Sequence, residues 1–502
     1  MDIKKLTESI GLTPEELRPF LINEIDEFLA SQNPEDQLDE FHDIIFALKN
    51  IAYAHTGKHM DIDNAIYENK IETRIRNYGT ISRKEPIFIH DCIRKMPIGV
   101  VHISFGNFKQ PWSHFDPFKN GTEVEIAMLT DNEFEKDNKY TNHVIVTFDA
   151  VDNITYSFLT SSWNEYEKNT ILCKIPDFIY KKAKEKANFS DVQNLLSLQL
   201  FSALKNLNLC KNCIFHLHSW ESVFAISSKE VKELMKSHRK IFSPYLTVSR
   251  LKDFLEKNGK VEGTLSKKEL DIASKYEEEL VKFADMTVVE SERDKLYYEK
   301  IGGKKVKKYS YTDFKEGTVP ANGIINGKLN FVAGGRPVYE KGFIELIKEL
   351  PDIIKYAENN KLKFSLKIFC KEYDRLTKEL KKASYIKELE DLIHKLNLGK
   401  YVSILDKVSI NKLREEIRDS CGLIVPSLYD PYCLMPHYSI EENKISFVSK
   451  YTGISENIQS EDYIFDPLKK GSLLNAIKKW ITEKKDFVLN NKNMSYKTLY
   501  KI

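Results

Sequence analysis

The chain has 502 residues, of which 42 % are hydrophobic and 30 % are charged, a composition typical of a globular protein of about three domains. The formal net charge of +2 excludes a strongly basic or acidic protein, so the total charge indicates no polyanionic partner. The first residues lack the apolar core of a signal peptide, and no run of about 18 apolar residues predicts a membrane span. The seven cysteines are scattered, which favours free thiols and a cytoplasmic protein. Cys210 and Cys213 form one CxxC, but a structural zinc site would need a second pair nearby.

Residues 1–85 predict a small all-α domain. Thr13-Pro14-Glu15-Glu16 and Asn33-Pro34-Glu35-Asp36 each combine a capping residue, a proline at the first helical position and acidic residues in the first turn. Apolar residues follow both starts at helical spacing, and a third helix is expected over 62–77.

From about residue 97, short apolar runs alternate with amphipathic stretches. The expected strands are IGVVHISFG, NHVIVTFDA, CIFHLH, DMTVVES, LNFVAGG, FSLKIFC, YVSILD and CGLIVPS. The expected helices cover 190–209, 266–284, 341–358, 373–396 and 410–419. This alternation predicts an α/β fold with doubly wound parallel sheets.

The length of this region predicts two Rossmann-like domains, because a single core of this kind rarely exceeds about 300 residues. We expect them at 97–315 and 316–485, with the break in the turn-rich segment 311–327 and a C-terminal tail at 486–502.

Four acidic residues repeat one spacing on the first two predicted helices. Glu24 and Glu27 are three residues apart, as are Glu40 and Asp43, and residues three apart share a helix face. Two antiparallel helices would bring both pairs together, and clustered carboxylates need a cation such as Mg²⁺ to offset their repulsion. The alternative explanation is a solvated acidic helix face, and the four carboxylates by themselves favour it. Apolar residues beside them, such as Ile25, favour the metal site instead.

The pattern E-x-x-E, twelve residues, E-x-x-D resembles the metal motif of the MazG-like nucleotide pyrophosphohydrolases over about the first 80 residues. The resemblance implies that these carboxylates bind Mg²⁺, which activates water to cleave a nucleoside triphosphate to monophosphate and pyrophosphate. It also implies a homodimer, and phosphate contacts from Lys70, Arg74 and Arg76. The chain departs from the family at Asn23, where the family has a glutamate.

The segment FVAGGRPVYEKGF, residues 331–343, predicts a strand that ends in a glycine turn before a helix. The N-terminus of a helix exposes backbone N–H groups that favour phosphates, and Arg336 and Lys341 would add two positive charges there. The pattern therefore predicts a diphosphate clamp, although an ordinary surface turn decorated with cations explains it equally well.

Four segments resemble motifs of the retaining glycosyltransferases with the GT-B fold, the glycogen-synthase-like and sucrose-synthase-like group. GGRPVYEKG resembles the GR…KG motif, FHLHSW resembles HxHDW, and YEEELVKFADMTVVESERDK resembles the E…AD…SE strand and helix. GLIVPSLYDPYCLMPHYSIEENKISFVSKYTGISENI resembles the donor segment, with matches in order at Pro426, Ser427, Asp430, Pro431, Leu434, Gly453 and Glu456.

The resemblance implies two Rossmann-like domains facing a cleft, with a nucleotide-sugar donor on the C-terminal one and a hydroxyl acceptor on the N-terminal one. Arg336, Lys341 and the turn at Gly335 would hold the leaving diphosphate without a metal ion or any cofactor besides the donor. Asp430 replaces a glutamate that contacts the donor sugar. His218 would lie in the cleft beside the transferred sugar, which moves with retention.

The donor segment departs from the family pattern at two further places. The family has a second glutamate eight residues after the first, which contacts the nucleotide ribose; here that residue is Tyr438, with Glu441 and Glu442 one turn later. We expect Leu434, Tyr438 and Glu441 at the donor sugar and nucleotide. Cys433 replaces a glycine.

Further candidates lie in the N-terminal Rossmann-like domain. Ser219 replaces the aspartate of HxHDW, and we expect His216 to point to the face of its strand opposite His218 and to be structural. Gly106, with Lys109, follows the first strand and is a candidate for contacts with the donor phosphates or the acceptor; a plain loop explains it equally well.

Three hypotheses follow. The first is a glycosyltransferase fused to a Mg²⁺-dependent pyrophosphohydrolase module that uses nucleoside triphosphates. In the second, the helical module only dimerises or senses nucleotides. In the third, the whole chain is a binding protein with a degenerate transferase site.

Overall fold

The computed structural model describes residues 97–105, 142–151, 170–186, 188–260, 263, 265–310, 317–321, 324, 327–373, 380–490, 494–495 and 499–500, together with Ile25, Glu27 and Leu29. The chain divides into two compact units. The smaller comprises Met1–Ile98, Val144–Cys210 and Phe224–Lys236, and the larger comprises Gly99–His143, Lys211–Val223 and Ser237–Ile502.

The predicted all-α domain lies outside the described residues, apart from three positions. Ile25, Glu27 and Leu29 are helical and exposed, so the structure does not bury Ile25 as its apolar character suggested. Among the described residues, no helix has the length and apolar character needed to cross a membrane.

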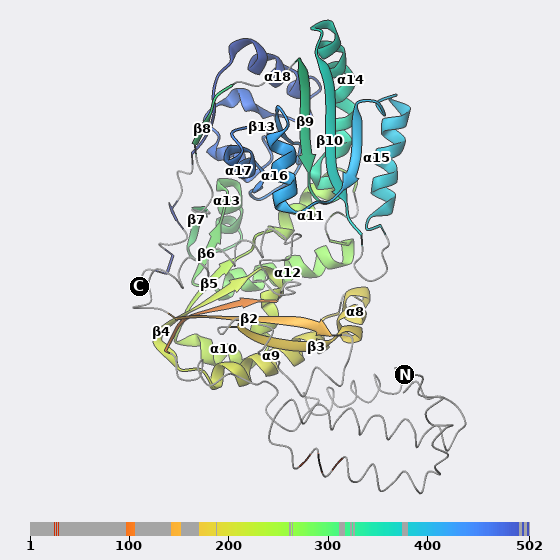
Figure 1. Ribbon diagram of the computed structural model, residues 1–502. Coiled ribbons are helices and arrows are strands. Elements are labelled where there is room, and N and C mark those ends of the chain that lie inside the picture. The colour runs from red at the N-terminus through yellow and green to blue at the C-terminus, as the bar shows by residue number, and fades with distance from the viewer. Residues whose placement is uncertain are drawn as a thin grey trace, which may run out of the picture. The chain divides into compact units, whose positions relative to one another are not determined.

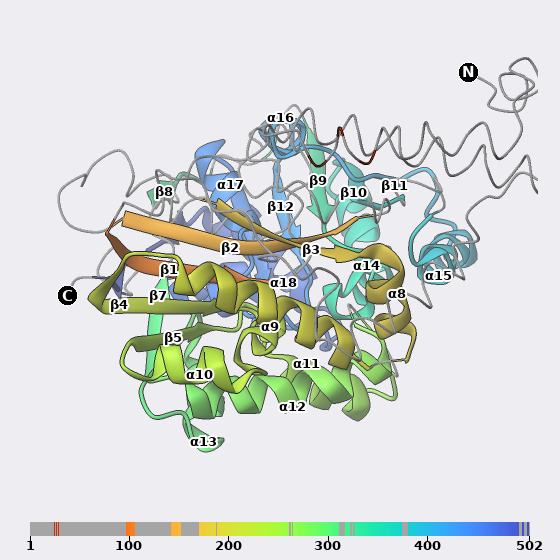
Figure 2. The same cartoon turned by 90° about the horizontal axis from the view of Figure 1, so that it is seen from below.

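The smaller unit is built on two parallel strands, β2 (Asn142–Val151) and β3 (Thr170–Pro176), which Figure 2 shows side by side. Three helices complete it: α8 (Asp177–Lys186), α9 (Ser190–Lys205) and α10 (Lys229–Lys236). α9 packs on β3 and α8 because Val192, Leu195 and Leu196 form one apolar helix face and are fully or almost fully buried.

The larger unit contains two sheets. In the first, the strands of this unit follow the order β16-β7-β6-β5-β4-β1, and the pairs from β4 to β16 are parallel. The strands are β1 (Ile98–Ser104), β4 (Leu209–His218), β5 (Arg239–Ser243), β6 (Met286–Val289), β7 (Val306–Ser310) and β16 (Met494–Ser495). The 3₁₀ helix η2 (Trp220–Ile226) follows β4, and three helices follow β5 and β6: α11 (Val248–Lys257), α12 (Lys267–Phe283) and α13 (Glu292–Lys300).

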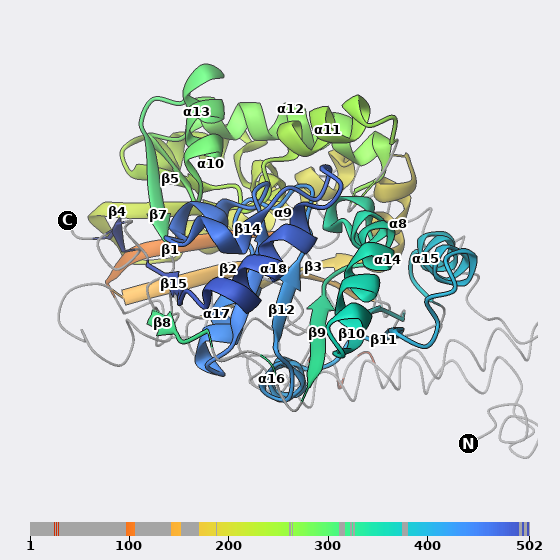
Figure 3. The same ribbon diagram turned by 90° about the horizontal axis from the view of Figure 1, so that it is seen from above.

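The second sheet is parallel throughout, in the order β11-β10-β9-β12-β13-β14. Figures 1 and 3 show its helices around these strands. The strands are β9 (Lys328–Gly334), β10 (Lys363–Lys371), β11 (Val402–Asp406), β12 (Gly422–Val425), β13 (Ile445–Ser449) and β14 (Ile464–Phe465). The α-helices are α14 (Phe343–Asn359), α15 (Ala383–Lys395), α16 (Ile410–Arg418), α17 (Met435–Glu441) and α18 (Ser472–Glu483).

Short elements complete the unit. The 3₁₀ helices are η3 (Tyr339–Lys341), η4 (Gly453–Asn457) and η5 (Glu461–Tyr463). β8 (Gly317–Val319) and β15 (Phe487–Leu489) form an antiparallel pair. The segment 486–502, set apart above as a tail, thus contributes β15 and β16, and its described residues also include the buried Leu499 and Tyr500.

The predicted α/β alternation is confirmed. Each of the eight predicted strands and five predicted helices appears, with ends that differ by a few residues at most sites and by about ten at the start of α15. The apolar patterns did not predict some short strands. β5, with the sequence RKIFS, carries two cations, and β13, with the sequence ISFVS, follows a helix without a clear break.

Candidate functional site

The loops after β9 and β12 meet at one edge of the second sheet. These strands are parallel neighbours, so their carboxyl ends lie together. Lys341 Nζ lies 2.5 Å from Asp430 Oδ2, and only 17 % and 11 % of the two side chains are exposed. The backbone N–H of Tyr432 donates to the other Asp430 oxygen at 3.4 Å. A cation and an anion from two predicted motifs are therefore held together.

Two glycines shape the loop that carries Lys341. Gly335 has φ of +146°, and a Cβ there would lie 3.6 Å from the Lys341 Cδ. Gly342 has φ of +70°, and a Cβ there would lie 2.0 Å from the carbonyl oxygen of Pro426. Any larger residue at position 342 would push the two loops apart, so glycine is needed there for both conformation and space.

A third glycine fixes Asp430. A Cβ on Gly453 would lie 1.7 Å from the carbonyl oxygen of Pro431, and the Gly453 N–H donates to the Asp430 carbonyl at 2.9 Å. Ile454 N–H donates to the Tyr432 carbonyl at 2.8 Å. The predicted Gly…Glu segment therefore supports the backbone around Asp430.

Arg336 follows the glycine turn and is exposed. Burial disfavours the charge of Glu372, at the end of β10, but Lys407, Lys381 and Arg336 together hold the pKa of that carboxyl below its usual value. Arg336 therefore adds positive potential at the edge of the sheet where Lys341 lies.

Cys433, where the motif that the donor segment resembles has a glycine, keeps a glycine-like backbone with φ of +78°. Burial, followed by the charge of Asp430, raises the pKa of its thiol to about 12. The thiol is therefore neutral at physiological pH. Leu434 comes next, immediately before α17, and is partly buried.

Glu441 and Glu442 do not join this group. They end α17, where Glu441 lies 3.3 Å from Arg414, and Glu442 lies 2.8 Å from Arg414 and 2.6 Å from Arg418. The structure therefore pairs Glu441 with Arg414 of α16, and the donor contact expected for Glu441 stays a prediction. Tyr438, in the middle of α17, is partly buried.

His218 differs from its prediction in environment. Its side chain is fully buried, with Nδ1 2.6 Å from the Tyr245 hydroxyl and Nε2 2.9 Å from His102 Nδ1. It therefore faces other protein groups rather than an open cleft. Tyr245, partly exposed after β5, is the more accessible polar group. No sequence motif pointed to Tyr245.

The prediction for His216 is wrong. Its ring centroid lies 3.9 Å from that of His218, on the same face of β4. Side chains alternate along a strand, so residues two apart share a face. Burial lowers the pKa of His216 to about 3, and burial with neighbouring histidines lowers the pKa values of His102 and His218 well below their usual range. These histidines are therefore neutral.

A buried polar network links α11, α12 and α13. Glu277 accepts hydrogen bonds from Val248 N, Ser249 N, Ser249 Oγ and Tyr298 Oη at 2.7–3.1 Å, and burial raises its pKa to about 7.

A second group of contacts lies next to this network. The Thr247 hydroxyl donates to Asp294 at 2.8 Å. The Tyr429 hydroxyl, one residue before Asp430, donates to the Thr247 carbonyl at 2.9 Å. The network therefore joins the donor-segment loop to the first sheet of the larger unit.

Glu456, the last residue matched to the donor motif, also contacts the first sheet's elements. It accepts a hydrogen bond from Glu292 N at 2.8 Å and lies 2.5 Å from Lys308 Nζ. Arg293 lies 3.8 Å from the same carboxylate.

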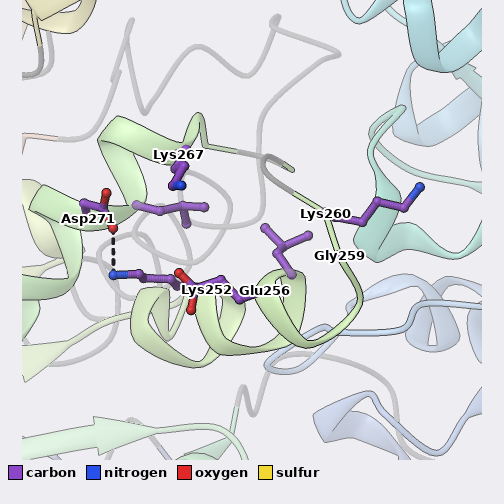
Figure 4. Close-up of a pocket in the computed structure, with 8 residues that line it drawn as sticks. Lys252, Glu256, Gly259, Lys260, Lys267 and Asp271 are labelled. Atoms are coloured by element: carbon purple, nitrogen blue, oxygen red, sulfur yellow. Dashed lines mark ion pairs between the residues drawn. The ribbon is translucent and has the colours of Figure 1, made fainter.

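A pocket of about 230 Å³ lies between α11 and α12 (Figure 4). Lys252 and Asp271 form an ion pair of 2.7 Å in its wall, and Leu255 and Leu270 contribute its apolar surface. None of the predicted site residues lines this pocket, so it provides no support for the predicted chemistry.

The remaining predictions lie largely outside the described residues. These include Glu24, Glu40, Asp43, Lys70, Arg74, Arg76 and Gly106. The expectation of free thiols is confirmed at Cys210, one of the described cysteines, which is free.

Comparisons with known proteins support the fold. No protein-family model matches the sequence, and a search of curated proteins finds no significant match. Solved structures do match. Sucrose-phosphate synthase from Thermosynechococcus elongatus is 14 % identical with a TM-score of 0.52, over 77 % of this chain and 90 % of that chain.

Two further structures match equally well. The UDP-forming α,α-trehalose-phosphate synthase from Burkholderia vietnamiensis is 13 % identical with a TM-score of 0.51, over 76 % of this chain and 91 % of that one. The trehalose-6-phosphate structure from E. coli bound with UDP-2-fluoro glucose is 13 % identical with a TM-score of 0.53, over the same shares. The chain therefore shares the α/β fold of these synthases, with two Rossmann-like parallel-sheet domains, as the GT-B resemblance implied.

Proposed function

We propose that the chain is a retaining glycosyltransferase that moves a hexose from a nucleotide-diphosphate sugar to a hydroxyl acceptor. The observation that carries this proposal is the meeting of Lys341 and Asp430, 2.5 Å apart, from two loops that separately resemble the clamp and donor motifs. The two loops can approach closely enough to form this pair because Gly342 has no side chain to meet Pro426.

The proposed step needs only groups that these loops supply. The bond between the sugar C1 and the diphosphate oxygen breaks, C1 bonds to the acceptor oxygen on the same face, and the acceptor proton passes to the leaving diphosphate. Lys341 and Arg336 would neutralise the charge that develops on that diphosphate. Asp430, which holds Lys341 in the free protein, would then turn to the hydroxyls of the donor sugar.

The remaining residues have supporting roles in this proposal. Gly335 would let the diphosphate approach the backbone, and Leu434 and Tyr438 would line the donor side of α17. His218 would act indirectly, by holding the Tyr245 hydroxyl at 2.6 Å.

A nucleotide-sugar screen tests the proposal. The names of similar structures suggest UDP-glucose as the first donor and sugar phosphates as the first acceptors. We expect acceptor-dependent release of nucleoside diphosphate, and a product with the anomeric configuration of the donor. The absence of both transfer and donor hydrolysis across UDP-, GDP- and ADP-sugars would instead support the degenerate binding protein.

For the N-terminal segment we propose a Mg²⁺-dependent nucleoside triphosphate pyrophosphohydrolase module held as a homodimer, on the spacing of Glu24, Glu27, Glu40 and Asp43. Pyrophosphate release that requires Mg²⁺ and is lost in Glu40→Ala is the expected result. No release from the intact protein would favour a module that only dimerises or senses nucleotides.

A further inference from the structure

A group of buried histidines lies in the first sheet of the larger unit. One ring nitrogen from each of His102, His216 and His218 lies within 4.8 Å of those from the other two, and all three side chains are fully buried. They come from β1 and β4, which are neighbours in the first sheet. Three imidazoles from adjacent strands therefore share one small volume.

The distances among these nitrogens suit a metal ion. His102 Nδ1 lies 2.9 Å from His218 Nε2, and the three nitrogens span no more than 4.8 Å. Tetrahedral zinc with Zn–N bonds of about 2.1 Å separates its ligand nitrogens by about 3.4 Å. The 2.9 Å separation is shorter than that value and the 4.8 Å limit is longer, so small ring rotations would bring the three nitrogens around one ion.

Each histidine ring also makes a hydrogen bond with a neighbouring side chain that fixes its orientation. Metal-ligating histidines almost always use their second ring nitrogen in a hydrogen bond that fixes the ring. His218 Nδ1 lies 2.6 Å from Tyr245 Oη, and His102 Nε2 lies 2.9 Å from His143 Nδ1. His216 lies 2.5 Å from the Tyr500 hydroxyl through Nδ1 and 2.7 Å from Ser243 Oγ through Nε2.

We propose that His102, His216 and His218 form a zinc-binding site between β1 and β4. Imidazole nitrogens suit zinc, whereas Mg²⁺ and Ca²⁺ require oxygen ligands that this group does not offer in sufficient number. Ser243 Oγ or a water molecule would complete the four-coordinate shell. Because Tyr500 contacts His216, zinc would also tie the C-terminal segment to the first sheet.

The competing explanation is a hydrogen-bonded row without metal. Neutral histidines can pass hydrogen bonds from Tyr245 through His218 and His102 to His143, since each ring has one donor and one acceptor. The two explanations differ in stoichiometric zinc content, so activity is not needed to separate them. Failure of the transferase proposal would leave this test unaffected.

The experiment measures zinc bound to the full chain, with any affinity tag removed. After chelation, addition of one equivalent of zinc and desalting, we expect about one zinc per chain by mass spectrometry. His102→Gln and His218→Gln should each retain less than a tenth of that amount. The matched controls are His394→Gln, an exposed histidine on α15, and the double variant Cys210→Ser/Cys213→Ser, which removes the CxxC. Both should retain full zinc.

A milder variant covers the case in which the histidine variants fail to fold. Tyr500→Phe removes only a hydroxyl that contacts His216, so it should keep about one zinc per chain but bind it about 10–100-fold more weakly in competition with a chelating dye. Wild-type protein that retains no zinc after reconstitution overturns the proposal. Loss of zinc in the cysteine variant, with retention in the histidine variants, overturns it too, as does unchanged zinc affinity in Tyr500→Phe.

Discussion

Lys341 Nζ lies 2.5 Å from Asp430 Oδ2, although 89 residues separate the two in the chain. The pair forms because β9 and β12 are parallel neighbours and their following loops reach the same edge of the sheet. In the proposed enzyme, a donor diphosphate would compete with Asp430 for the lysine. The strand order of the sheet therefore brings together the two residues that the proposed reaction uses.

Lys341→Ala should reduce sugar transfer by about 10²–10³-fold, because it removes a fixed positive charge from the leaving diphosphate. The measurement is kcat/KM with the best donor from the screen. Lys348→Ala, an exposed lysine on α14 that pairs with Glu345, is the matched control and should behave like wild type. Full activity in Lys341→Ala would remove the clamp from the mechanism, and Arg336→Ala tests its second cation in the same way.

Gly342→Ala should destabilise the protein by more than about 2 kcal/mol, because it combines a left-handed backbone with a severe clash. The added Cβ would lie 2.0 Å from the Pro426 carbonyl oxygen. Thermal unfolding measures the effect. Gly399→Ala is the control, since a Cβ there meets nothing within 4 Å, and its unfolding midpoint should stay the same or rise slightly. Equal midpoints for both variants would contradict the packing of the two loops.

Glu442→Gln should lower stability by about 1–3 kcal/mol and leave the donor KM unchanged. The carboxylate is almost buried and contacts Arg414 and Arg418 from α16. Glu441→Gln, which weakens one ion pair with Arg414, should have a smaller effect on stability. A raised donor KM in Glu441→Gln would instead support the donor contact expected for Glu441 from the sequence, and a raised donor KM in Glu442→Gln would contradict a purely structural role for Glu442.

Glu277 should make stability depend on pH. Burial raises its pKa from 4.5 to about 7, so the folded state holds a proton that the unfolded state releases between these values. Its contribution is therefore fully present below about pH 4.5 and is lost as the pH rises through about 7, by roughly 3 kcal/mol.

Urea unfolding of wild type and Glu277→Gln at pH 5 and pH 8 measures this pH-dependent contribution to the free energy of unfolding. The variant should lose the pH dependence that Glu277 provides. It should also be less stable at pH 5, because an amide nitrogen only donates and cannot replace a carboxyl oxygen that accepts from the backbone N–H of Val248 or Ser249. Glu278→Gln, an exposed neighbour on the same helix, should keep the wild-type pH dependence. The same pH slope in Glu277→Gln as in wild type would show that Glu277 titrates normally.

The sequence by itself determined the alternation of strands and helices from residue 98 onward, because buried parallel strands and amphipathic helices each leave a local pattern of apolar residues. It also identified Lys341 as a candidate, since the glycine turn around it is a local feature, whereas Asp430 became a candidate through the resemblance of its segment to the donor motif. The two-residue period of a strand places His216 and His218 on one face of β4, so this relationship is also local, and the expectation of opposite faces was wrong.

Only the tertiary structure decided which of these residues meet. The contact of Gly342 with Pro426, the commitment of Glu441 to Arg414 and the burial of His218 all depend on strand order and on packing between distant segments. The gathering of His102, His216 and His218 depends on β1 and β4 being neighbours, and Tyr500 joins them from the far end of the chain. Long-range pairing leaves no periodic trace in a single sequence, so these relationships follow from the folded sheet alone.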